Sequence, residues 1–383
     1  MKKRPFRRRL FLVFIVLLVV YSGWLGWSIR RFARSEVRLP DRAGPPFEVV
    51  GVYHIHTKFS DGQRSPDKVA EIAARQSLDF IILTDHGRPN RASLASQGWK
   101  NDTLVLAGSE LSTNRGHLVA LGFATPKTEF SQNAEQAARE IEAQGGFSVI
   151  AHPFSKTRWS WGKDMVYSGL EIIDSDTMIK RNFLAALPYF PALLFRPQLY
   201  LLKTLERPAE TLRKWDSLSA DTAVSGYFSA DAHLFYSALF SCFRLHVLLD
   251  QPLTRNFEAA RAQVFDALGR GKFYSAVDAA RPAGGFRFWA KGEGPRARLD
   301  GTIPFSPASP PTLRVEAPFP FAAETRLIRN GETIARSAER ELAHPAERPG
   351  VYRVEVYLKS PWPLARDVPW IVSNPIYLRE EAK

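Results

Sequence analysis

Histidine and acidic residues gather in short motifs along the middle of this chain. The stretch HIHTKFSDG places His54 and His56 one residue apart, and Asp61 follows five residues later. On a β-strand, residues two apart point to the same side, so both imidazoles can reach one ion. The same spacing separates Asp231 from His233 in SADAH. Such pairs favour a metal site built on strand ends.

Six of the eight histidines stand where apolar strands end or loops begin: His54, His56, His86, His117, His152 and His233. Asp61, Glu110 and Asp231 accompany them. A single histidine is more often structural, but this set exceeds what one tetrahedral ion needs. Imidazole and carboxylate ligands suit zinc, manganese or iron. The sequence therefore predicts two or three divalent metal ions, with Glu110 as the best candidate for a bridging ligand.

The elements that must position these residues alternate between strands and helices. Buried strands are expected over VVGVYHIH, DFIILTDH, FSVIAHP, GLEIIDSD and VSGYFSADAH, and helices over PDKVAEIAARQSL and NAEQAAREIEAQGG. Chemistry at the C-terminal ends of strands is typical of a β/α barrel, and an open doubly wound sheet places its ligands there too. We find no glycine-rich phosphate fingerprint, so a nucleotide cofactor is not indicated.

Over residues 50–280 the chain resembles the polymerase and histidinol phosphatase (PHP) family. The resemblance is carried by six motifs taken together: HIHTKFSDG, ILTDHG, GSE, GHLVALG, IAHP and SADAH. The resemblance implies an α/β fold with a distorted (β/α)7 barrel that holds two or three divalent ions and acts as a phosphoesterase. Carried over motif by motif, it implies the metal ligands His54, His56, Asp61, His86, Glu110, His117, His152, Asp231 and His233. The SDG version of the first motif, with Asp61 where some members have a further histidine, resembles the short-chain phosphoesterase branch.

The expected reaction uses a metal-bridged hydroxide, because water shared by two divalent ions loses a proton near neutral pH. The hydroxide would attack phosphorus in line, and Asp61, Glu110 and Asp231 are the expected catalytic carboxylates. We find no clear Ser–His or Cys–His pair that would supply a side-chain nucleophile instead.

Three further residues receive roles from their places beside the ligands. Asp85 precedes His86 and points the other way on a continuing strand, so we expect it to orient a ligand histidine. Lys58 and Arg115 lie close to ligands in the sequence. They are candidates to hold phosphate oxygens, with ordinary surface charge as the alternative.

The N-terminus predicts a membrane anchor. Basic residues crowd positions 1–9, and residues 10–29 carry no charge. Twenty residues at ~1.5 Å each match the ~30 Å hydrocarbon core. Trp24 and Trp27 near its end favour an uncleaved anchor over a cleaved signal peptide. The positive-inside rule places residues 1–9 in the cytoplasm, with a linker over 30–48 and the remainder in the periplasm, held by a single pass through the inner membrane.

The charge and cysteine content exclude several classes of protein. The formal net charge of +13 is partly explained by the basic N-terminus, so nucleic acid is not an expected partner. The single cysteine, Cys242, excludes an intrachain disulfide and zinc sites with several thiolates. Its apolar surroundings predict a buried, inert thiol.

An apolar insertion over residues 183–205 follows Asp174 and Asp176. These two could orient metal ligands or be ordinary loop carboxylates, and we favour the second interpretation. The three prolines of the insertion argue against one spanning helix. Two interpretations remain open: short helices packed over the barrel, or a segment lying on the membrane that admits a lipid-linked or envelope substrate.

The barrel is expected over residues 49–282, and the region 283–383 predicts strands only. A hairpin signal at Asn330-Gly331 supports an immunoglobulin-like β-sandwich there. The expected substrate is a phosphorylated small molecule or envelope component. The alternatives are a metal-dependent amide or ester hydrolase and a non-catalytic metal- or ligand-binding envelope module.

Overall fold

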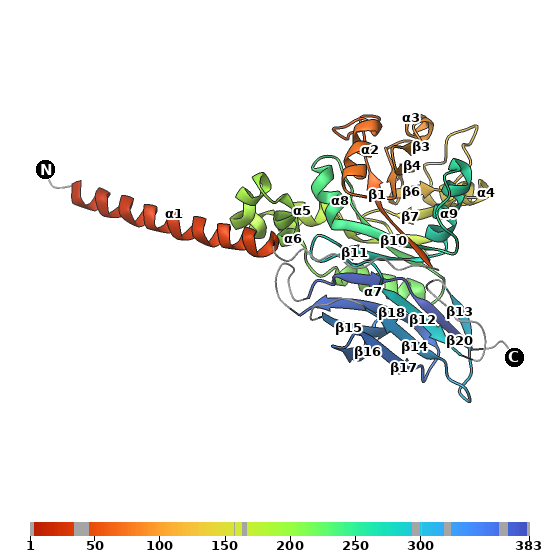
Figure 1. The fold of residues 1–383 in the computed structure, drawn as a ribbon. Coiled ribbons are helices and arrows are strands. Elements are labelled where there is room, and N and C mark those ends of the chain that lie inside the picture. Colours follow the sequence, from red (N-terminus) through yellow and green to blue (C-terminus); the bar gives the residue numbers. More distant parts are fainter. Residues whose placement is uncertain are drawn as a thin grey trace.

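The computed structural model describes residues 4–33, 46–156, 158–162, 167–292, 299, 301–317, 323–359 and 367–380. The described chain has a mixed α/β architecture that follows one long N-terminal helix (Figure 1). Most of the linker expected over 30–48, together with the first three residues of the tail, lies outside the described residues.

The N-terminal helix α1 (Arg4–Ala33) projects away from the body of the protein (Figure 1). Its stretch Arg7–Arg31 is long and apolar enough to cross a bilayer, so α1 is a candidate membrane span or signal sequence. Large apolar side chains are exposed along it from Leu10 to Val20, whereas Leu25 and Ser28 are buried where the helix reaches the body.

Two sheets build the part of the chain that carries the motifs. The larger sheet includes β1 (Phe47–Ile55), β2 (Phe80–Leu83), β3 (Gly98–Lys100), β4 (Thr103–Ala107), β10 (Phe243–Leu249) and β11 (Phe273–Val277). The smaller runs in the order β5 (Ser109–Thr113), β6 (Gly116–Leu121), β7 (Phe147–Ile150), β8 (Gly169–Asp174) and β9 (Ser225–Ser229). Isolated bridges between Ile55 and Ala232 and between His86 and Glu110 join the sheets. Both bridges lie at or beside predicted ligands.

The strands do not alternate strictly with helices. Only Gly108 separates β4 from β5, and β5 pairs antiparallel with β6 across the turn Asn114-Arg115. A connection this short can join antiparallel strands only, because a parallel pair needs a crossover of a dozen or more residues. The hairpin brings Glu110 and His117 to the same end of the smaller sheet.

The two helices expected beside the first motifs are confirmed as α2 (Pro66–Arg75) and α4 (Ala134–Ala143). Pro66 begins α2, and the Asn133 side chain caps α4 by accepting from Gln136 N. The other helices of this part are α3 (Arg91–Ala95), α7 (Ala209–Ser219), α8 (Tyr236–Cys242) and α9 (Phe257–Gly269). Cys242 is buried, as predicted, and burial raises the pKa of its thiol to about 12.

The apolar insertion forms short helical segments in place of one long helix. α5 (Ser175–Ala186) leads into the 3₁₀ helix η1 (Leu187–Leu194), and α6 (Pro197–Thr204) follows. Non-helical backbone at Asn182 bends α5. Pro188 and Pro197 lie at the starts of η1 and α6, and Pro191 lies inside η1. The chain here forms no single straight helix, as the prolines predicted.

Every element described after residue 286 is a strand. β12 (Arg287–Lys291), β14 (Thr312–Glu316) and β17 (Glu341–Pro345) form a separate sheet. The larger sheet continues through β13 (Thr302–Phe305), β15 (Ala323–Arg329), β16 (Glu332–Ser337), β18 (Gly350–Leu358), β19 (Ile371–Ser373) and β20 (Ile376–Glu380). The hairpin at Asn330-Gly331 is confirmed, with φ of 48° and 87°.

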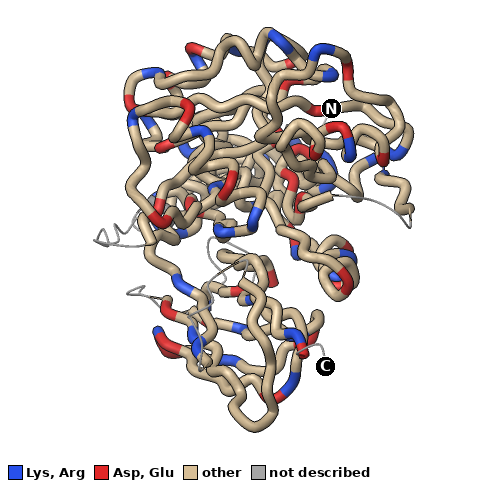
Figure 2. The backbone as a smooth tube through the Cα atoms, turned by 90° about the vertical axis from the view of Figure 1, so that its right-hand side faces the viewer, with Lys and Arg blue, Asp and Glu red and all other residues tan. Residues whose placement is uncertain are grey.

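The C-terminal strands are hydrogen-bonded to the part that carries the motifs. β19 pairs with β11, so one sheet crosses the boundary expected between residues 282 and 283. Figure 2 shows the C-terminal strands as a lower layer, with basic and acidic residues interspersed over both layers.

Candidate metal centre

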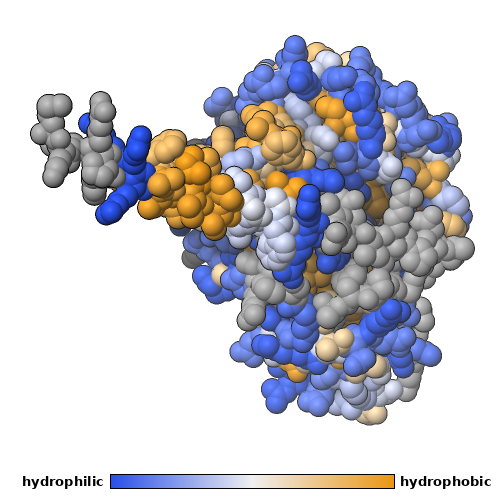
Figure 3. Space-filling view, turned by 60° about the vertical axis from the view of Figure 1, so that its left-hand side comes forward, coloured by the Kyte–Doolittle hydropathy of each residue, from blue (hydrophilic) through white to orange (hydrophobic). Residues whose placement is uncertain are grey.

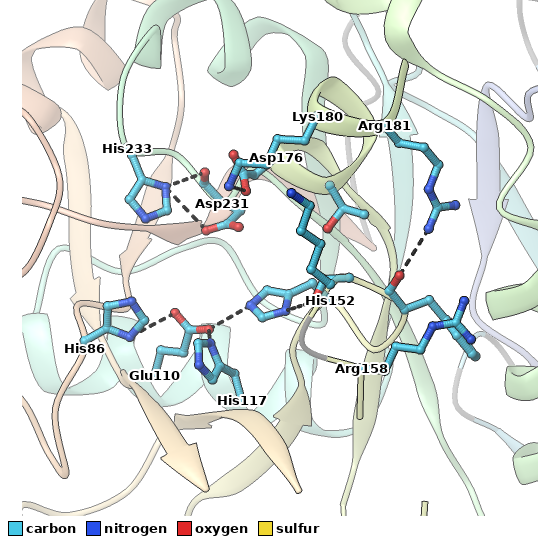
Figure 4. Close-up of a pocket in the computed structure, with 14 residues that line it drawn as sticks. His86, Glu110, His117, His152, Arg158, Asp176, Lys180, Arg181, Asp231 and His233 are labelled. Atoms are coloured by element: carbon cyan, nitrogen blue, oxygen red, sulfur yellow. Dashed lines mark hydrogen bonds and ion pairs between the residues drawn. The ribbon is translucent and has the colours of Figure 1, made fainter. Parts of the chain in front are cut away.

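Glu110 in β5 is buried at the centre of the predicted ligand cluster. Five imidazole nitrogens lie within 3.4 Å of its two carboxylate oxygens, on His54, His56, His86, His117 and His152. His54 and His117 lie in β1 and β6, and the other three follow the C-terminal ends of strands: His56 after β1, His86 after β2 and His152 after β7. Figure 4 shows that His86, His117 and His152 point toward Glu110 from different directions.

Two more carboxylates and a sixth imidazole complete the cluster. Asp231 Oδ1 lies 3.5 Å from His54 Nε2 and 3.4 Å from His56 Nε2. Asp61 Oδ1 lies 3.3 Å from His56 Nδ1, and Asp61 Oδ2 lies 3.3 Å from His233 Nε2. The structure therefore brings all of the metal ligands predicted from the sequence into one place.

The donor atoms fit divalent metal ions. His56 Nε2 and His86 Nδ1 are buried, yet neither forms a hydrogen bond within the described part of the chain. Three overlapping groups have ligand atoms within 4.8 Å of one another: His56, Asp61, His86 and His233; His54, His56 and Glu110; His86, Glu110 and His117. Spare imidazole nitrogens beside carboxylates are ligands that zinc, manganese and iron accept.

Three of the cluster residues have a strained backbone. The φ angles of His54, His152 and Asp231 are 66°, 26° and 37°. For residues other than glycine, this left-handed region costs on the order of 1–3 kcal/mol each. Such strain persists where the surrounding structure enforces it, which is common at functional sites.

The HIHTKFSDG loop is held by Asp85, whose carboxylate is buried. Thr57 donates from its backbone N to Asp85 Oδ1 at 2.6 Å, and Ser60 Oγ donates to the same oxygen at 2.7 Å. A Cβ at Gly62 would lie 2.3 Å from His56 O, so only glycine allows this loop to close. Asp85 was expected to orient a histidine. Among the described residues its hydrogen bonds go to hydroxyl and backbone N–H groups instead, so it orients the loop.

Glu171 in β8 was not identified from the sequence, although it is buried beneath the cluster. His54 Nδ1 lies 2.5 Å from Glu171 Oε1, and His152 N donates to Glu171 Oε2 at 2.7 Å. The carboxylate thus orients one ligand ring and fixes the backbone of a second ligand. A charged residue inside the otherwise apolar run GLEII was the available signal.

The cluster strongly attracts positive charge. Burial disfavours the charged form of Glu110, but attraction to His54 and hydrogen bonds with further histidines hold the pKa of Glu110 well below its usual range. Burial likewise opposes protonation of His54. The charges of Glu171, Asp231 and Glu110 nevertheless raise the pKa of His54 well above its usual value. Protons on the imidazoles or metal ions can supply the positive charge that these carboxylates favour.

Asp174 and Asp176 are not ordinary loop carboxylates. Asp174 ends β8, is buried, and caps α5 by accepting from Thr177 N at 2.7 Å. Burial, with the charge of Asp231, raises the pKa of Asp174 to about 8. Asp176 pairs with Lys180 and lines the cavity described next. The local sequence did not show that α5 begins directly at the site.

A cavity of about 440 Å³ opens over the cluster. Six predicted ligands line it: His86, Glu110, His117, His152, Asp231 and His233. Four basic residues also line it, and none was singled out from the sequence: Lys156, Arg158, Lys180 and Arg181. In Figure 4 Lys180 and Arg181 approach from the α5 side.

Lys58 and Arg115 lie outside this lining. Lys58 is exposed to solvent. The Arg115 guanidinium pairs with Glu135 of α4 and donates to Ser160 O at 3.0 Å. Closeness to a ligand in the sequence did not bring either cation to the cavity, because Arg115 already has a carboxylate partner on the flank of the smaller sheet.

Comparison with known proteins gives distant likenesses. No family model matches the chain. An uncharacterized protein of Methanocaldococcus jannaschii is 24% identical over 138 residues, which cover 32% of this chain and 80% of that protein.

Two solved structures are similar to this chain at low TM-scores. A two-domain protein of Bacteroides vulgatus, described as containing a predicted PHP-like metal-dependent phosphoesterase, has a TM-score of 0.44 and 17% identity, covering 89% of this chain and 98% of its own. An amidohydrolase from Chromobacterium violaceum has a TM-score of 0.31 and 15% identity. The match covers 48% of this chain and 87% of the amidohydrolase. The identities and TM-scores are low, and the function of the chain is inferred from the geometry of the site.

Proposed function

We propose that this chain is a membrane-anchored, extracytoplasmic, metal-dependent phosphoesterase of the PHP type. The observation that carries the proposal is the convergence of six imidazoles with the carboxylates of Asp61, Glu110 and Asp231, under a cavity with a basic rim. Nitrogen and oxygen donors hold divalent ions, and basic side chains hold the oxygens of a phosphate ester.

The proposed barrel consists of β1, β2, β4 continued by β5, β6, β7, β8 and β9. The bridges from Ile55 to Ala232 and from His86 to Glu110 support this ring, because they join the two sheets on both sides of the cluster. The C-terminal strands would then form the immunoglobulin-like β-sandwich, with β12, β14 and β17 as one of its sheets.

The ligand groups indicate which residues would hold the ions. Glu110, His56 and His86 each belong to two of the three groups, and Glu110 is the carboxylate among them, so it is the candidate bridging ligand. When bound, divalent ions acidify water and offset the negative charge of a phosphoryl group. Glu171 keeps the His54 ring oriented, and Asp85 holds the loop that carries Asp61.

The basic rim would bind the phosphate group of the substrate. Lys180 forms an ion pair with Asp176, and Arg181 Nη1 lies 2.9 Å from Glu206 Oε1. Lys156 is exposed and forms no ion pair with the described residues, so it is the cation most available to an incoming phosphate. Lys58 and Arg115 remain predictions from the sequence.

The proposed location follows from α1 and the charges at its ends. The segment Arg7–Arg31 would cross the inner membrane once, with the basic tail in the cytoplasm and the site in the periplasm. Fusing a reporter active only in the periplasm to the C-terminus tests this orientation, and a reporter active only in the cytoplasm is the matched control.

The activity is tested with purified full-length protein. Elemental analysis without added metal should find at least one of zinc, manganese and iron. A panel of phosphomonoesters, phosphodiesters, amides and carboxylic esters should then show turnover of a phosphate ester that Asp231→Asn removes. Hydrolysis of amides or carboxylic esters alone would assign a different hydrolase. Bound metal without turnover would favour a binding module, and absence of metal would contradict the proposal.

A further inference from the structure

The end of α5 and the whole of η1 present an apolar strip to solvent. Its six large side chains are Phe183, Leu184, Leu187, Phe190, Leu194 and Phe195. Leu184, Leu194 and Phe195 are 77%, 81% and 69% exposed. The sequence from 183 to 195 contains no charged residue. Exposed apolar patches of this kind mark contacts with protein or membrane.

The strip is continuous with the candidate membrane helix. Tyr21 OH donates to Pro188 O at 2.7 Å, and the rings of Trp24 and Tyr189 lie 5.0 Å apart. Leu25 of α1 is buried at the same junction. In Figure 3 apolar side chains of the body lie beside α1 where the helix reaches the body. The strip is therefore placed laterally against the anchor.

The contacts also set the depth of the strip. Trp24 follows the first apolar residue of the span, Leu10, by fourteen residues, or ~21 Å of helix rise. The hydrocarbon core is ~30 Å thick, so Trp24 lies ~9 Å inside its far boundary, in the outer leaflet. Tyr21, Trp24 and Tyr189 form an aromatic group there, in the half of the core that faces the body.

From this placement we propose that the strip is embedded in the outer leaflet of the membrane, with lipid as its partner. At the depth of Trp24, a bilayer surrounds every face of α1 that protein does not cover. Exposed leucine and phenylalanine side chains on η1 therefore meet acyl chains and headgroups at that depth. The basic residues that flank the strip, Arg181 and Arg196, suit the negative charge of phospholipid headgroups.

The same helix connects the strip to the cavity, which bears on the substrate. Lys180 and Arg181 line the cavity, Phe183 and Leu184 belong to the strip, and only Asn182 separates the two sets. The cavity mouth thus lies beside the membrane surface. If the proposed function holds, the substrate must present its phosphate group at this surface. We therefore assign the substrate class as an amphiphile that stays in the bilayer and carries a phosphate headgroup.

The membrane contact is tested with the full chain in lipid vesicles. Cys242 is buried, so a fluorophore attaches only to an introduced cysteine. A probe at Leu194→Cys should lose its emission when lipids carry a quencher near the headgroup. Val13→Cys in α1 gives the value for a lipid-embedded site, and Glu332→Cys, exposed on β16, gives the value for solvent.

If lipid quenches the probe at position 194 no more than the probe at position 332, the membrane contact is overturned. A probe shielded from water but not quenched by lipid would place protein, such as a second copy of the chain, on the strip, and would overturn it as well.

The substrate class is tested with Leu187→Glu/Leu194→Glu, two changes at exposed positions. The variant should lose turnover of long-chain phosphatidic acid in vesicles and keep turnover of its short-chain, water-soluble form. Equal turnover of the vesicle substrate by variant and wild type would contradict the assigned class. If wild type hydrolyses neither form while the probe at 194 is quenched, the assigned substrate fails and the membrane contact stands. Failure of the phosphoesterase itself would show separately, in the panel of phosphate esters described above.

Discussion

Two buried clusters of histidine and carboxylate lie in this protein, and they differ in how the histidines are used. In the candidate metal centre, His56 Nε2 and His86 Nδ1 have no hydrogen bond among the described residues. In the second cluster, His246 Nδ1 lies 2.8 Å from Glu48 Oε1, and His246 Nε2 lies 3.0 Å from Asp278 Oδ1. Both nitrogens of that ring are therefore occupied.

Further side chains form hydrogen bonds with Glu48 in the second cluster. Tyr274 OH donates to Glu48 Oε1 at 2.7 Å, and Arg287 Nη1 donates to Glu48 Oε2 at 2.6 Å. The ring of His246 stacks on that of Tyr274, with centroids 4.6 Å apart. This cluster ties β1, β10 and β11 to β12.

The comparison shows that a buried histidine between carboxylates is not by itself a metal site. The centre around Glu110 has spare nitrogens, a cavity and three strained ligands, whereas Glu48, His246 and Asp278 are not among the described residues with positive φ. Spare lone pairs bind cations, and saturated hydrogen bonds stabilise the fold. Substitutions in both clusters test this distinction.

The largest effect is expected from Glu110→Gln, which removes the central charge with little change in shape. Since Glu110 faces five imidazoles, metal content should fall, and turnover should drop by more than the ~10–100-fold that loss of an outer partner costs. Elemental analysis and steady-state rates measure both. The matched change in the second cluster, Glu48→Gln, should leave metal content unaltered; a loss of metal there would erase the distinction.

His246→Leu should act on stability and not on metal. Removing the ring leaves Glu48 and Asp278 buried without their shared cation, and breaking such a buried pair costs on the order of 3–5 kcal/mol. Denaturant unfolding of the detergent-solubilised protein measures the change. A free energy of unfolding equal to that of wild type would mean that the second cluster does not stabilise the fold.

Glu171→Gln should weaken the metal centre less than Glu110→Gln. The carboxylate orients His54 without belonging to any of the three ligand groups, and such partners contribute ~10–100-fold to metal affinity or rate. Titration with a competing chelator gives the affinity. Glu135→Gln, which frees Arg115 outside the cavity, serves as the control and should have no effect.

The smallest effect is a pH dependence of stability. Burial of His246 disfavours its charge, but attraction to Asp278 and hydrogen bonds with Asp278 and Glu48 raise the pKa of His246 to about 9. In the unfolded chain a histidine loses its proton near pH ~6.5. The stabilisation is thus full below pH ~6.5 and disappears as pH rises through about 9.

Between pH ~6.5 and ~8 the loss should reach at most about 2 kcal/mol. Thermal unfolding at several pH values should show wild type falling toward His246→Leu as pH rises. Parallel curves for the two proteins would contradict the raised pKa.

The sequence was sufficient to find the residues of the candidate metal centre because each lies in a short motif. His54 and His56 belong to one motif at the end of β1, although the φ of 66° at His54 and the end of the strand at Ile55 depart from the regular strand that the spacing predicted. The turn between β5 and β6 brings His117 opposite Ser112, near Glu110. The helices α2 and α4 were predictable for the same reason, since proline, asparagine caps and apolar spacing are local signals.

Residues that act through pairing between distant strands could not be found in this way. Glu171 reaches His54 because β8 lies between β7 and β9, and the basic rim exists because α5 starts at the site. The junction of β11 with β19 likewise joins segments that are nearly one hundred residues apart. Each depends on which surfaces pack together, and no local pattern encodes that choice.

The local sequence specified the chemical character of this protein: an apolar N-terminal helix, nine candidate nitrogen and oxygen ligands in short motifs, and a single buried thiol. The tertiary structure alone decided that Glu110 lies among five rings, that Glu171 supports His54, and that η1 lies beside α1. The physical reason is the distance along the chain over which each effect acts. Periodicity, capping and side-chain chemistry act over a few residues, whereas packing brings distant segments together.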